Sequence, residues 1–501
     1  MKTLFKISVI FGMLATFVAC TEGFDELGKN PNAAESVNAS YYLTKVITRT
    51  AYNYNNSAFS GKIPNAARYI TKLTNSESDG FNWSAESWDD YYYTLSINKS
   101  FYDEAIAEGQ EQYAALSEIM AVFNFDCVTS LWGDCPYSEA LMSKEEGIVN
   151  PSYDKQEVIY PDLLKRLEAA NETLASTSQS IDATADIMYK GSALKWRKLA
   201  NSLRLRMLLK ASKSMSSAIS DIQAIVSDQT RYPIFTSNAD AAEIPYVEQY
   251  KWPMGPTLGG AITDQFKEFI KRRPSKEIID YMLPRNDPRL EALFDKVEDP
   301  ASCTVDFNDY VGVPIALKSP YGYNGGQSGT SKTVSTFSKE KFYQDTGDYL
   351  KASMMIYPEV CFILSEVAAV NGVSVPGETA ESLYNKGIKA SMEYWGVDDS
   401  SAINEYLSND LVKYDGTQKR ILEQKWLALI IKGPESWFDY RRTGDAIGLN
   451  AQLVPDNLKQ NYIPYRFIYP DNERSYNREK YEAAIAVFGT DDINTKMWLI
   501  K

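Results

Sequence analysis

The stretch EQYAALSEIMAVFNFDCVTSLWGDCPY, residues 111–137, decides the fold class of this chain. Its apolar residues recur at helical spacing from Glu111 to about Thr129. Gly133 and Pro136 follow, and both residue types are costly in a helix interior. The stretch therefore predicts a helix that ends in a tight turn. Its expected core residues are Leu116, Ile119, Val122, Phe123 and Val128.

The same periodicity recurs along the chain. It predicts further helices over about 39–54, 85–102, 157–175, 189–212, 351–370, 380–395 and 420–432. Helices of this length joined by short turns favour stacked hairpins of the tetratricopeptide kind, although no clean repeat of about 34 residues can be traced. The expected fold class is mainly α, with degenerate tetratricopeptide-type helical hairpins. The apolar tail 496–499 is expected to dock onto this body.

One predicted helix, 189–212, is unusually basic. We interpret its cations as a solvated face, or as stems that lie over apolar surface. They are Lys195, Arg197, Lys198, Arg204, Arg206 and Lys210.

The middle of the chain, about 231–348, is crowded with proline and glycine and predicts a loop-rich insertion. Long irregular segments are usually either functional or disordered. Aromatic residues here, such as Trp252, Tyr321 and Tyr323, favour ordered binding segments over disorder.

The first twenty residues predict a lipoprotein signal peptide. Lys2 and Lys6 precede an apolar run, 7–19, that is too short to span a bilayer, and Cys20 follows Ala19. The order resembles the lipobox of bacterial lipoproteins, in which the cysteine is acylated. An ordinary signal peptide with a chance cysteine is the alternative. We therefore expect a signal peptide at 1–19 and one body at 20–501, held to a membrane by lipid on Cys20. No later apolar run approaches the roughly 20 residues that a spanning helix needs.

Composition excludes several classes of function. The 501 residues contain no histidine, which removes the commonest general base, the Ser-His-Asp triad and most zinc sites. A net charge of −14 argues against nucleic acid as a partner. Carboxylate-pair hydrolysis survives, because 66 acidic residues always offer pairs somewhere. We expect no enzymatic activity.

Neither the cysteines nor the acidic residues predict a metal site. Cys127 and Cys135 are the only close pair, no CxxC element occurs, and no disulfide is predicted. Cys361 is expected to be a small buried residue. Calcium is compatible with the acidic pairs 398–399 and 491–492, but neither has the spacing of a calcium loop. The expected cofactor set is empty.

Aromatic residues make up 13% of the chain, and tyrosine is the most abundant of them. Tyrosine and tryptophan combine a flat apolar face with a polar group. This combination suits stacking on sugar rings, and it equally suits protein interfaces.

Several separate segments carry short motifs whose order extends over nearly the whole chain. They are Phe24-Asp25-Glu26, Asn30-Pro31-Asn32, Leu131-Trp132-Gly133-Asp134, Pro136-Tyr137, Trp196, Ala200-Asn201-Ser202-Leu203-Arg204, Arg206, Asp287-Pro288-Arg289-Leu290, Tyr357-Pro358-Glu359-Val360, Ser365-Glu366-Val367-Ala368, Lys425-Trp426, Glu435-Ser436-Trp437, Tyr440-Arg441-Arg442-Thr443-Gly444, Arg466, Ile468-Tyr469-Pro470, Glu473 and Asn477. Together these segments resemble the SusD/RagB family of nutrient-binding outer-membrane lipoproteins, in particular its second SusD-like subgroup.

The resemblance implies a mostly helical protein whose irregular segments build the ligand face. Such proteins cap a SusC-like TonB-dependent transporter, deliver oligosaccharides or other nutrients to it, and catalyse nothing. They sit on the outer membrane, exposed at the cell surface. The positions at which the family often carries ligand residues hold Phe81, Asn82, Trp83, Trp252, Tyr321 and Tyr323 in this sequence.

Packing is the competing interpretation for several residues. Trp83 follows a polar loop, so binding and packing are about equally favoured, whereas Trp88 and Tyr92 have core-like spacing. Asp439, Arg441 and Arg442 are expected to form a buried or interface ion network.

Three functions remain open at this point. One is nutrient capture, in which aromatic faces bind a sugar. The second is a protein-binding helical scaffold, or a transporter lid without its own ligand site. The third, a carboxylate-based glycoside hydrolase, is disfavoured by the missing histidine and by the resemblance.

Overall fold

The computed structural model describes residues 38–59, 61–74, 79–248, 251–252, 254–256, 262–327, 331–344, 347–450, 460 and 462–501. The predicted signal peptide, residues 1–19, and Cys20 lie outside these ranges. The expected boundary between the signal peptide and the body at residue 20 therefore also lies outside them.

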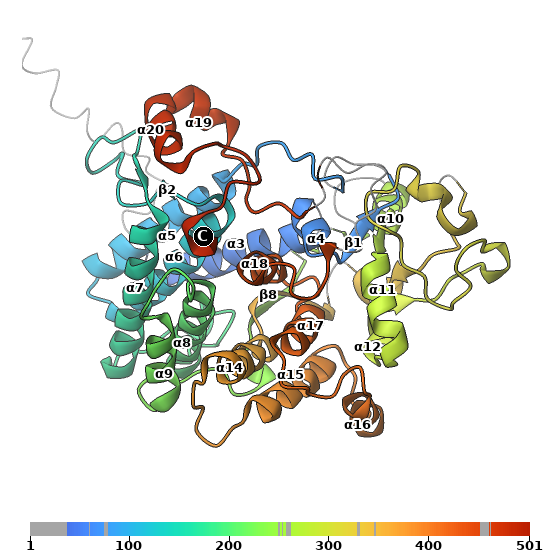
Figure 1. Ribbon diagram of the computed structural model, residues 1–501. Coiled ribbons are helices and arrows are strands. Elements are labelled where there is room, and N and C mark those ends of the chain that lie inside the picture. Colours follow the sequence, from blue (N-terminus) through green and yellow to red (C-terminus); the bar gives the residue numbers. More distant parts are fainter. Residues whose placement is uncertain are drawn as a thin grey trace, which may run out of the picture.

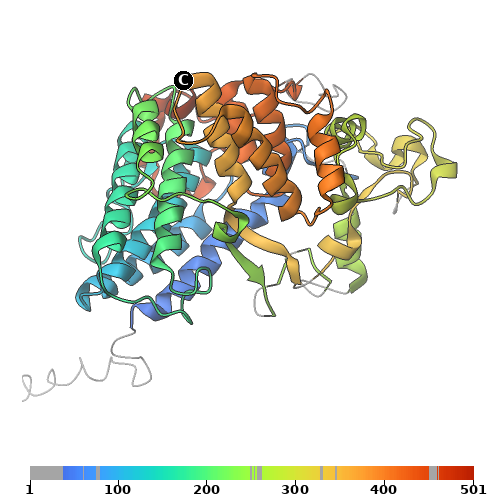
Figure 2. The same cartoon turned by 90° about the horizontal axis from the view of Figure 1, so that it is seen from below.

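Half of the molecule is a stack of antiparallel helices (Figures 1 and 2). Each helix packs on the next along the chain, as the predicted helical hairpins require. The stack consists of α5 (Asp89–Ala107), α6 (Glu111–Trp132), α7 (Gln156–Ser176), α8 (Ala193–Lys210) and α9 (Ala218–Ser227).

A second helical group follows later in the chain. In it, α14 packs against α15 and α17, and also against α8 of the first stack. Its helices are α14 (Tyr357–Asn371), α15 (Ala380–Tyr394), α16 (Ser400–Ser408), α17 (Gln418–Ala428) and α18 (Glu435–Thr443), and α19 (Asp471–Tyr476) and α20 (Arg478–Phe488) follow. Met497, Leu499 and Ile500 are buried, so the predicted docking of the tail is confirmed.

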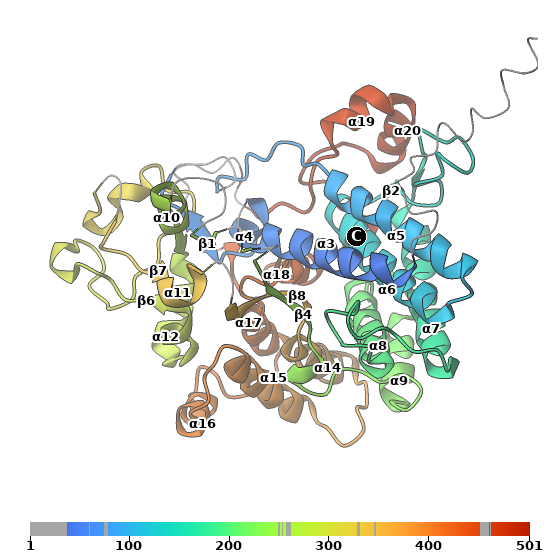
Figure 3. The same cartoon turned by 180° about the vertical axis from the view of Figure 1, so that it is seen from behind.

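Helix α3 (Ser40–Phe59) runs across the molecule and joins the helical stack to the irregular side (Figure 3). It packs against α5, α6 and β8. The short helix α4 (Lys62–Ala66) follows it directly.

The predicted loop-rich middle contains short elements separated by irregular chain. Among the described residues, the named strands form antiparallel pairs: β1 with β5, β4 with β8, and β6 with β7, while β2 pairs with β3 elsewhere. The strands are β1 (Ile70–Lys72), β2 (Cys135–Pro136), β3 (Tyr153–Asp154), β4 (Ala242–Tyr246), β5 (Arg272–Pro274), β6 (Phe294–Asp295), β7 (Thr336–Phe337) and β8 (Gly347–Met355). The helices between them are α10 (Ile262–Ile270), α11 (Lys276–Met282), α12 (Arg289–Leu293) and α13 (Lys339–Phe342).

The helix predicted from residue 351 is wrong at its start, because residues 347–355 form β8 instead. Pairing with β4 decides the conformation of this segment. The sequence of the segment itself does not identify β4 as its partner. Pro358 lies in the first turn of α14, where proline is well tolerated, and it marks the true helix start.

Helix α6 has the length and apolar composition to cross a membrane, contrary to the expectation from sequence. Nearly all of its apolar window is nevertheless buried inside the protein, and α3, α5 and α7 pack around it. It is the central core helix, and all five of its predicted core residues are buried.

Three of the six basic residues of α8, Arg204, Arg206 and Lys210, are buried, which corrects the sequence interpretation for them, whereas Lys195, Arg197 and Lys198 are partly exposed. Arg206 and Lys210 are 3% and 6% exposed and point into the interior. Arg206 binds Glu359 on α14 through two hydrogen bonds of 2.7 and 2.5 Å. Lys210 pairs with Asp126 on α6 at 2.6 Å. Such pairs tolerate burial because charge and hydrogen bonding are both satisfied.

Glu435 on α18 completes this buried ion cluster. Its Oε1 lies 3.8 Å from an Arg206 nitrogen and 3.7 Å from Lys210 Nζ. The hydroxyl of Tyr54 on α3 donates to the same carboxylate at 3.4 Å, and that of Tyr160 on α7 donates to Asp126 at 2.8 Å. The cluster therefore joins helices from both groups.

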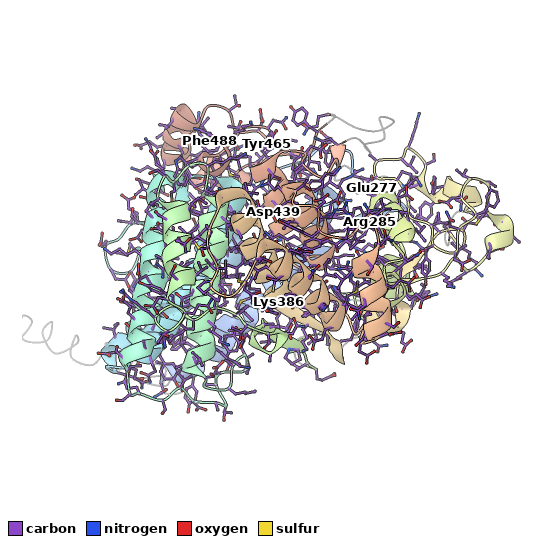
Figure 4. All side chains as sticks on the ribbon, turned by 60° about the horizontal axis from the view of Figure 1, so that its bottom comes forward. Glu277, Arg285, Lys386, Asp439, Tyr465 and Phe488 are labelled. Carbon is purple, nitrogen blue, oxygen red and sulfur yellow. The ribbon has the colours of Figure 1, made fainter. Side chains whose placement is uncertain are left out.

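A second network confirms one expectation and corrects another. Asp439 accepts from Arg442 at 2.9 Å and from Lys425 at 2.7 Å, and Arg442 also binds Glu366. Asp439 lies at the centre of the molecule (Figure 4). Arg441 is not part of this network, because its guanidinium donates to two backbone carbonyls and lies over the Trp437 and Phe438 rings.

Replacing Glu359 by glutamine is expected to lower the free energy of unfolding by about 3 kcal/mol, because Arg206 would stay buried without its main counter-charge. Urea denaturation measures this loss. The control is Glu172→Gln, which removes an equivalent pair with Arg231 in which both side chains are at least half exposed; it is expected to leave the transition unchanged. Equal transitions for both variants would contradict the structural role of the cluster.

The buried ammonium group of Lys432 should make the free energy of unfolding depend on pH. Lys432 is 4% exposed, donates to the Tyr394 hydroxyl at 2.9 Å, and burial lowers its pKa to about 8. An unfolded lysine has a pKa of about 10.4. Between these values the unfolded chain binds more protons than the folded chain, so the contribution of Lys432 to stability rises with pH. The stability difference between wild type and Lys432→Met should therefore increase from pH 8 to pH 10. A constant difference would contradict this.

Candidate functional site

The loop that carries three of the predicted ligand residues lies between β1 and α5. Asp79, which precedes these residues, is buried and holds the loop against α4 and β1. Asp79 accepts from the Asn65 side chain at 2.7 Å, from Thr71 Oγ1 at 3.3 Å and from the Lys72 amide at 3.2 Å. The loop is thereby placed by internal hydrogen bonds.

Of the three predicted ligand residues in this loop, Phe81 and Trp83 are buried and Asn82 is exposed. The Trp83 ring packs edge-on against Trp437 and Phe467, with centroid distances of 5.5 and 5.7 Å. The structure gives both aromatic residues a packing role. Direct ligand contact by Phe81, Asn82 or Trp83 stays a prediction.

The other predicted ligand residues lie elsewhere. Trp252 is buried and packs against Phe59 and Tyr246. Tyr321 and Tyr323 are half-buried on a small separate core of the side lobe, residues 294–335 (yellow in Figures 1 and 3). No ring contact in the described ranges joins the three groups, so the structure does not assemble them into one site. Their role in binding stays a prediction.

A groove does open directly beside the predicted loop. It lies between the end of α3, the start of α4, residues 86–87 and the first turn of α5, and its volume is about 320 Å³. This size is at the lower end of small-molecule sites. We call it the α3–α5 groove. Its lining comprises Asn53, Asn56, Ser57, Gly61, Lys62, Ile63, Glu86, Ser87, Asp90, Tyr91, Leu131, Trp132 and Phe467.

Lys62 fixes the geometry of this groove. It is 8% exposed, and its ammonium donates to the Ser84 carbonyl at 2.5 Å and pairs with Glu86 at 2.8 Å. The same ammonium lies 5.9 Å from the centre of the Phe467 ring. One buried cation therefore ties the loop to α4. Trp83 packs against Phe467, and Phe467 lines the groove, so the predicted tryptophan contributes to the groove through Phe467.

The groove presents amides, hydroxyls and an aromatic ring. Asn53 donates to the Asp90 carbonyl at 3.2 Å and to Thr94 Oγ1 at 3.1 Å, and its own Oδ1 makes no hydrogen bond with the described residues. Tyr91 is half-buried, with its ring edge-on to Trp132 at 6.1 Å. Asn56 is exposed at the rim. Such a lining binds neutral polar molecules through hydrogen bonds and ring contact.

The charges of the groove are already paired. Glu86 pairs with Lys62, and Asp90 with Arg49 at 3.1 Å. Neither carboxylate is placed as an unpaired acid or base, and the four described cysteines are free and buried. Burial raises the pKa of the thiols of Cys127, Cys135 and Cys361, so they are not activated nucleophiles. The arrangement favours binding over chemistry.

In each acidic pair weighed for calcium, one aspartate makes bonds within the protein, and calcium binding itself stays untested. Asp399 caps α16 by accepting from two backbone amides, and Asp491 accepts from Arg466 at 3.0 Å and Arg474 at 2.9 Å. In the described part of the chain, no cluster of three or more potential ligand side chains could hold a metal ion.

Sequence reasoning missed the residues that line the groove. Asn53, Asn55, Asn56 and Ser57 form a polar run inside helix α3, which is unusual for an otherwise core-facing helix. That run was the available signal. Tyr91 falls within the helix predicted over about 85–102, and its helical spacing does not single it out as a groove residue.

Comparison with known proteins reveals extensive similarity. The family model SusD-like, described as starch-binding and associating with the outer membrane, matches residues 31–470. A SusD homologue from Bacteroides fragilis is 25% identical, with a TM-score of 0.76, over 93% of this chain and 100% of that chain. An outer-membrane nutrient-binding candidate from Bacteroides vulgatus is 27% identical, with a TM-score of 0.75 and the same coverage.

A chitin-binding SusD homologue from Flavobacterium johnsoniae is 21% identical, with a TM-score of 0.71, over 92% of this chain and 99% of that chain. At this identity the likeness concerns the fold. No protein among those with curated functions matches. The structural matches confirm the predicted mainly helical fold class.

Lys62→Met is expected to loosen the loop, because the Ser84 carbonyl and Glu86 lose their shared cation. Amide hydrogen exchange of residues 84–88 should accelerate about tenfold, which corresponds to the loss of one charge-assisted hydrogen bond. Lys155→Met is the control, since Lys155 is exposed and pairs only with Glu157 at 3.6 Å. Unchanged exchange at 84–88 in the Lys62 variant would refute this role.

Proposed function

Because the chain belongs to the SusD-like family, we propose that it captures an oligosaccharide, or another nutrient, and passes it to a SusC-like TonB-dependent transporter in the outer membrane. The family description names both starch binding and association with the outer membrane. The nutrient would bind in the α3–α5 groove, with one or two sugar units seated and the rest of the chain outside.

The observation that carries this proposal is the lining of the groove. Asn53 offers a side-chain oxygen and Tyr91 the edge of an aromatic ring, and the amide residue Asn56 lies at the rim. Sugars present hydroxyls around an apolar ring, and this chemistry matches amides beside an aromatic side chain. Because the local carboxylates are paired, the groove suits a neutral ligand.

Attachment to the membrane is proposed through acylation of Cys20. The net charge of −14 disfavours docking of the body onto an anionic membrane surface. Two or more acyl chains hold a protein durably where one does not. The body would then remain at the cell surface beside its transporter.

The protein is proposed to alter no covalent bond in its ligand. The chain has no histidine, and Glu86 and Asp90 in the groove are each paired with a cation. A glycosidase needs one carboxylic acid held protonated and a second carboxylate opposite it.

The proposal is tested on the purified full chain in detergent, first on a glycan array and then by calorimetry with the best oligosaccharide. Tyr91→Ala is expected to weaken binding at least about tenfold, because it removes the accessible ring of the groove. Product analysis after prolonged incubation should return only intact oligosaccharide.

The matched control is Tyr476→Ala, which removes a tyrosine that is 82% exposed on α19 and should leave the affinity unchanged. Full affinity in the Tyr91 variant would refute the groove as the site. Shortened products would refute the binding function itself.

A further inference from the structure

A second cavity lies along the same helix as the groove, on another part of its surface. It is open to solvent and lies between α5, α6, α7 and residues 137–141, and its volume is about 300 Å³. We call it the α5–α7 cavity. The groove uses Asp90 and Tyr91 from the start of α5, whereas this cavity uses Leu95, Asn98 and Tyr102 from later turns.

Aromatic side chains fill the space between the two sites. Trp88 contacts Tyr92 at 5.4 Å, Tyr92 contacts Phe125 at 6.4 Å, and Phe125 contacts Tyr137 at 4.8 Å between ring centroids. Tyr137 and Phe125 themselves form part of the cavity wall. The cavity is thus a separate site rather than an extension of the groove.

The polar side of the cavity is an ordered network around Tyr137. Arg166 donates from Nε to Glu118 at 2.5 Å and from Nη1 to the Tyr137 hydroxyl at 2.8 Å. That hydroxyl donates in turn to Asp162 Oδ2. Within the described residues, Glu118 Oε1, Asp162 Oδ1 and Arg166 Nη2 have no hydrogen-bond partner. The network therefore presents two acceptors and one donor in fixed positions.

A buried acceptor in the wall gives an independent indication of a ligand. Asn98 is 3% exposed, and its Nδ2 donates to the Ser117 carbonyl at 3.0 Å. Its Oδ1 is buried and has no hydrogen-bond partner. Native proteins rarely leave such an atom unsatisfied, because desolvation without a hydrogen bond is costly.

The opposite side of the cavity is apolar and partly strained. Leu95, Phe125 and Leu141 line it. Leu141 has φ of +64°, a left-handed conformation that non-glycine residues adopt only where the surroundings enforce it. Strain of this kind gathers at ligand-contacting segments.

We propose that the α5–α7 cavity binds one neutral sugar ring, independently of the α3–α5 groove. A pyranose has apolar C–H faces for the Leu95 and Phe125 side, and hydroxyls for the carboxylates and the guanidinium. Arg166 is balanced by Glu118 and Asp162, and Lys99 by Asp103 and Glu145 at 2.7 and 3.0 Å. With no surplus positive charge, the cavity disfavours acidic sugars.

The test is calorimetry on the full chain in detergent with D-glucose, D-galactose, D-xylose and N-acetyl-D-glucosamine, alongside D-glucuronate and D-galacturonate. At least one neutral sugar should bind with a Kd in the millimolar range, as expected for a ligand of this size. It should bind at least about tenfold more tightly than either uronate.

Asp162→Asn is the decisive variant, because Asp162 is exposed and its replacement leaves the core untouched. It should weaken binding of the neutral sugar at least about tenfold, while Asp221→Asn on α9 should not. Absence of binding by all four neutral sugars would overturn the proposal, as would equal binding of a uronate. Binding that survives in Asp162→Asn but is lost in Tyr91→Ala would assign the sugar to the groove and also overturn it.

Discussion

The arrangement of the helices depends on a buried ion cluster. Arg206 and Lys210 of α8 meet Glu359 of α14, Glu435 of α18 and Asp126 of α6 in the interior. Charges at this depth are tolerated only when their partners are in place, so the helices that supply them must adopt one mutual position. The cluster has one more carboxylate than cations. Tyrosine hydroxyls donate hydrogen bonds to two of the carboxylates. Burial raises the pKa of Glu435, and both effects reduce the cost of the excess negative charge.

The arrangement of helices around this ion cluster determines where ligands can reach the protein. Helix α5 packs on α3 and α6 and contributes its first turn to the groove and its later turns to the cavity. Both sites are therefore built on rigid helices, and the loop that closes the groove is tied down by Lys62 and Asp79. Sites supported in this way need little reorganisation on binding, which favours affinity for small ligands.

The predicted ligand residues illustrate what a local pattern can and cannot report. The loop at 79–88, which carries three of the predicted ligand residues, borders the α3–α5 groove. Trp83, however, lies beneath that surface and packs on Phe467, because Trp437 and Phe467, hundreds of residues later in the chain, provide a closer apolar partner. The polar residues that flank Trp83 in the sequence do not reveal a packing partner so far along the chain. The buried basic residues of α8 were misjudged for the same reason, as their acidic partners lie on other helices.

The amino-acid sequence by itself determined the helical class, most helix positions, the buried character of α6 and the family, because these follow from residue periodicity and from local motifs. It also excluded histidine chemistry, since composition alone settles that matter. Tertiary structure decided which charges are buried, which aromatic rings remain accessible, and that residues 347–355 form a strand. Each of these depends on contacts between segments far apart in the chain, and the free energy of such a contact belongs to both partners rather than to either segment alone.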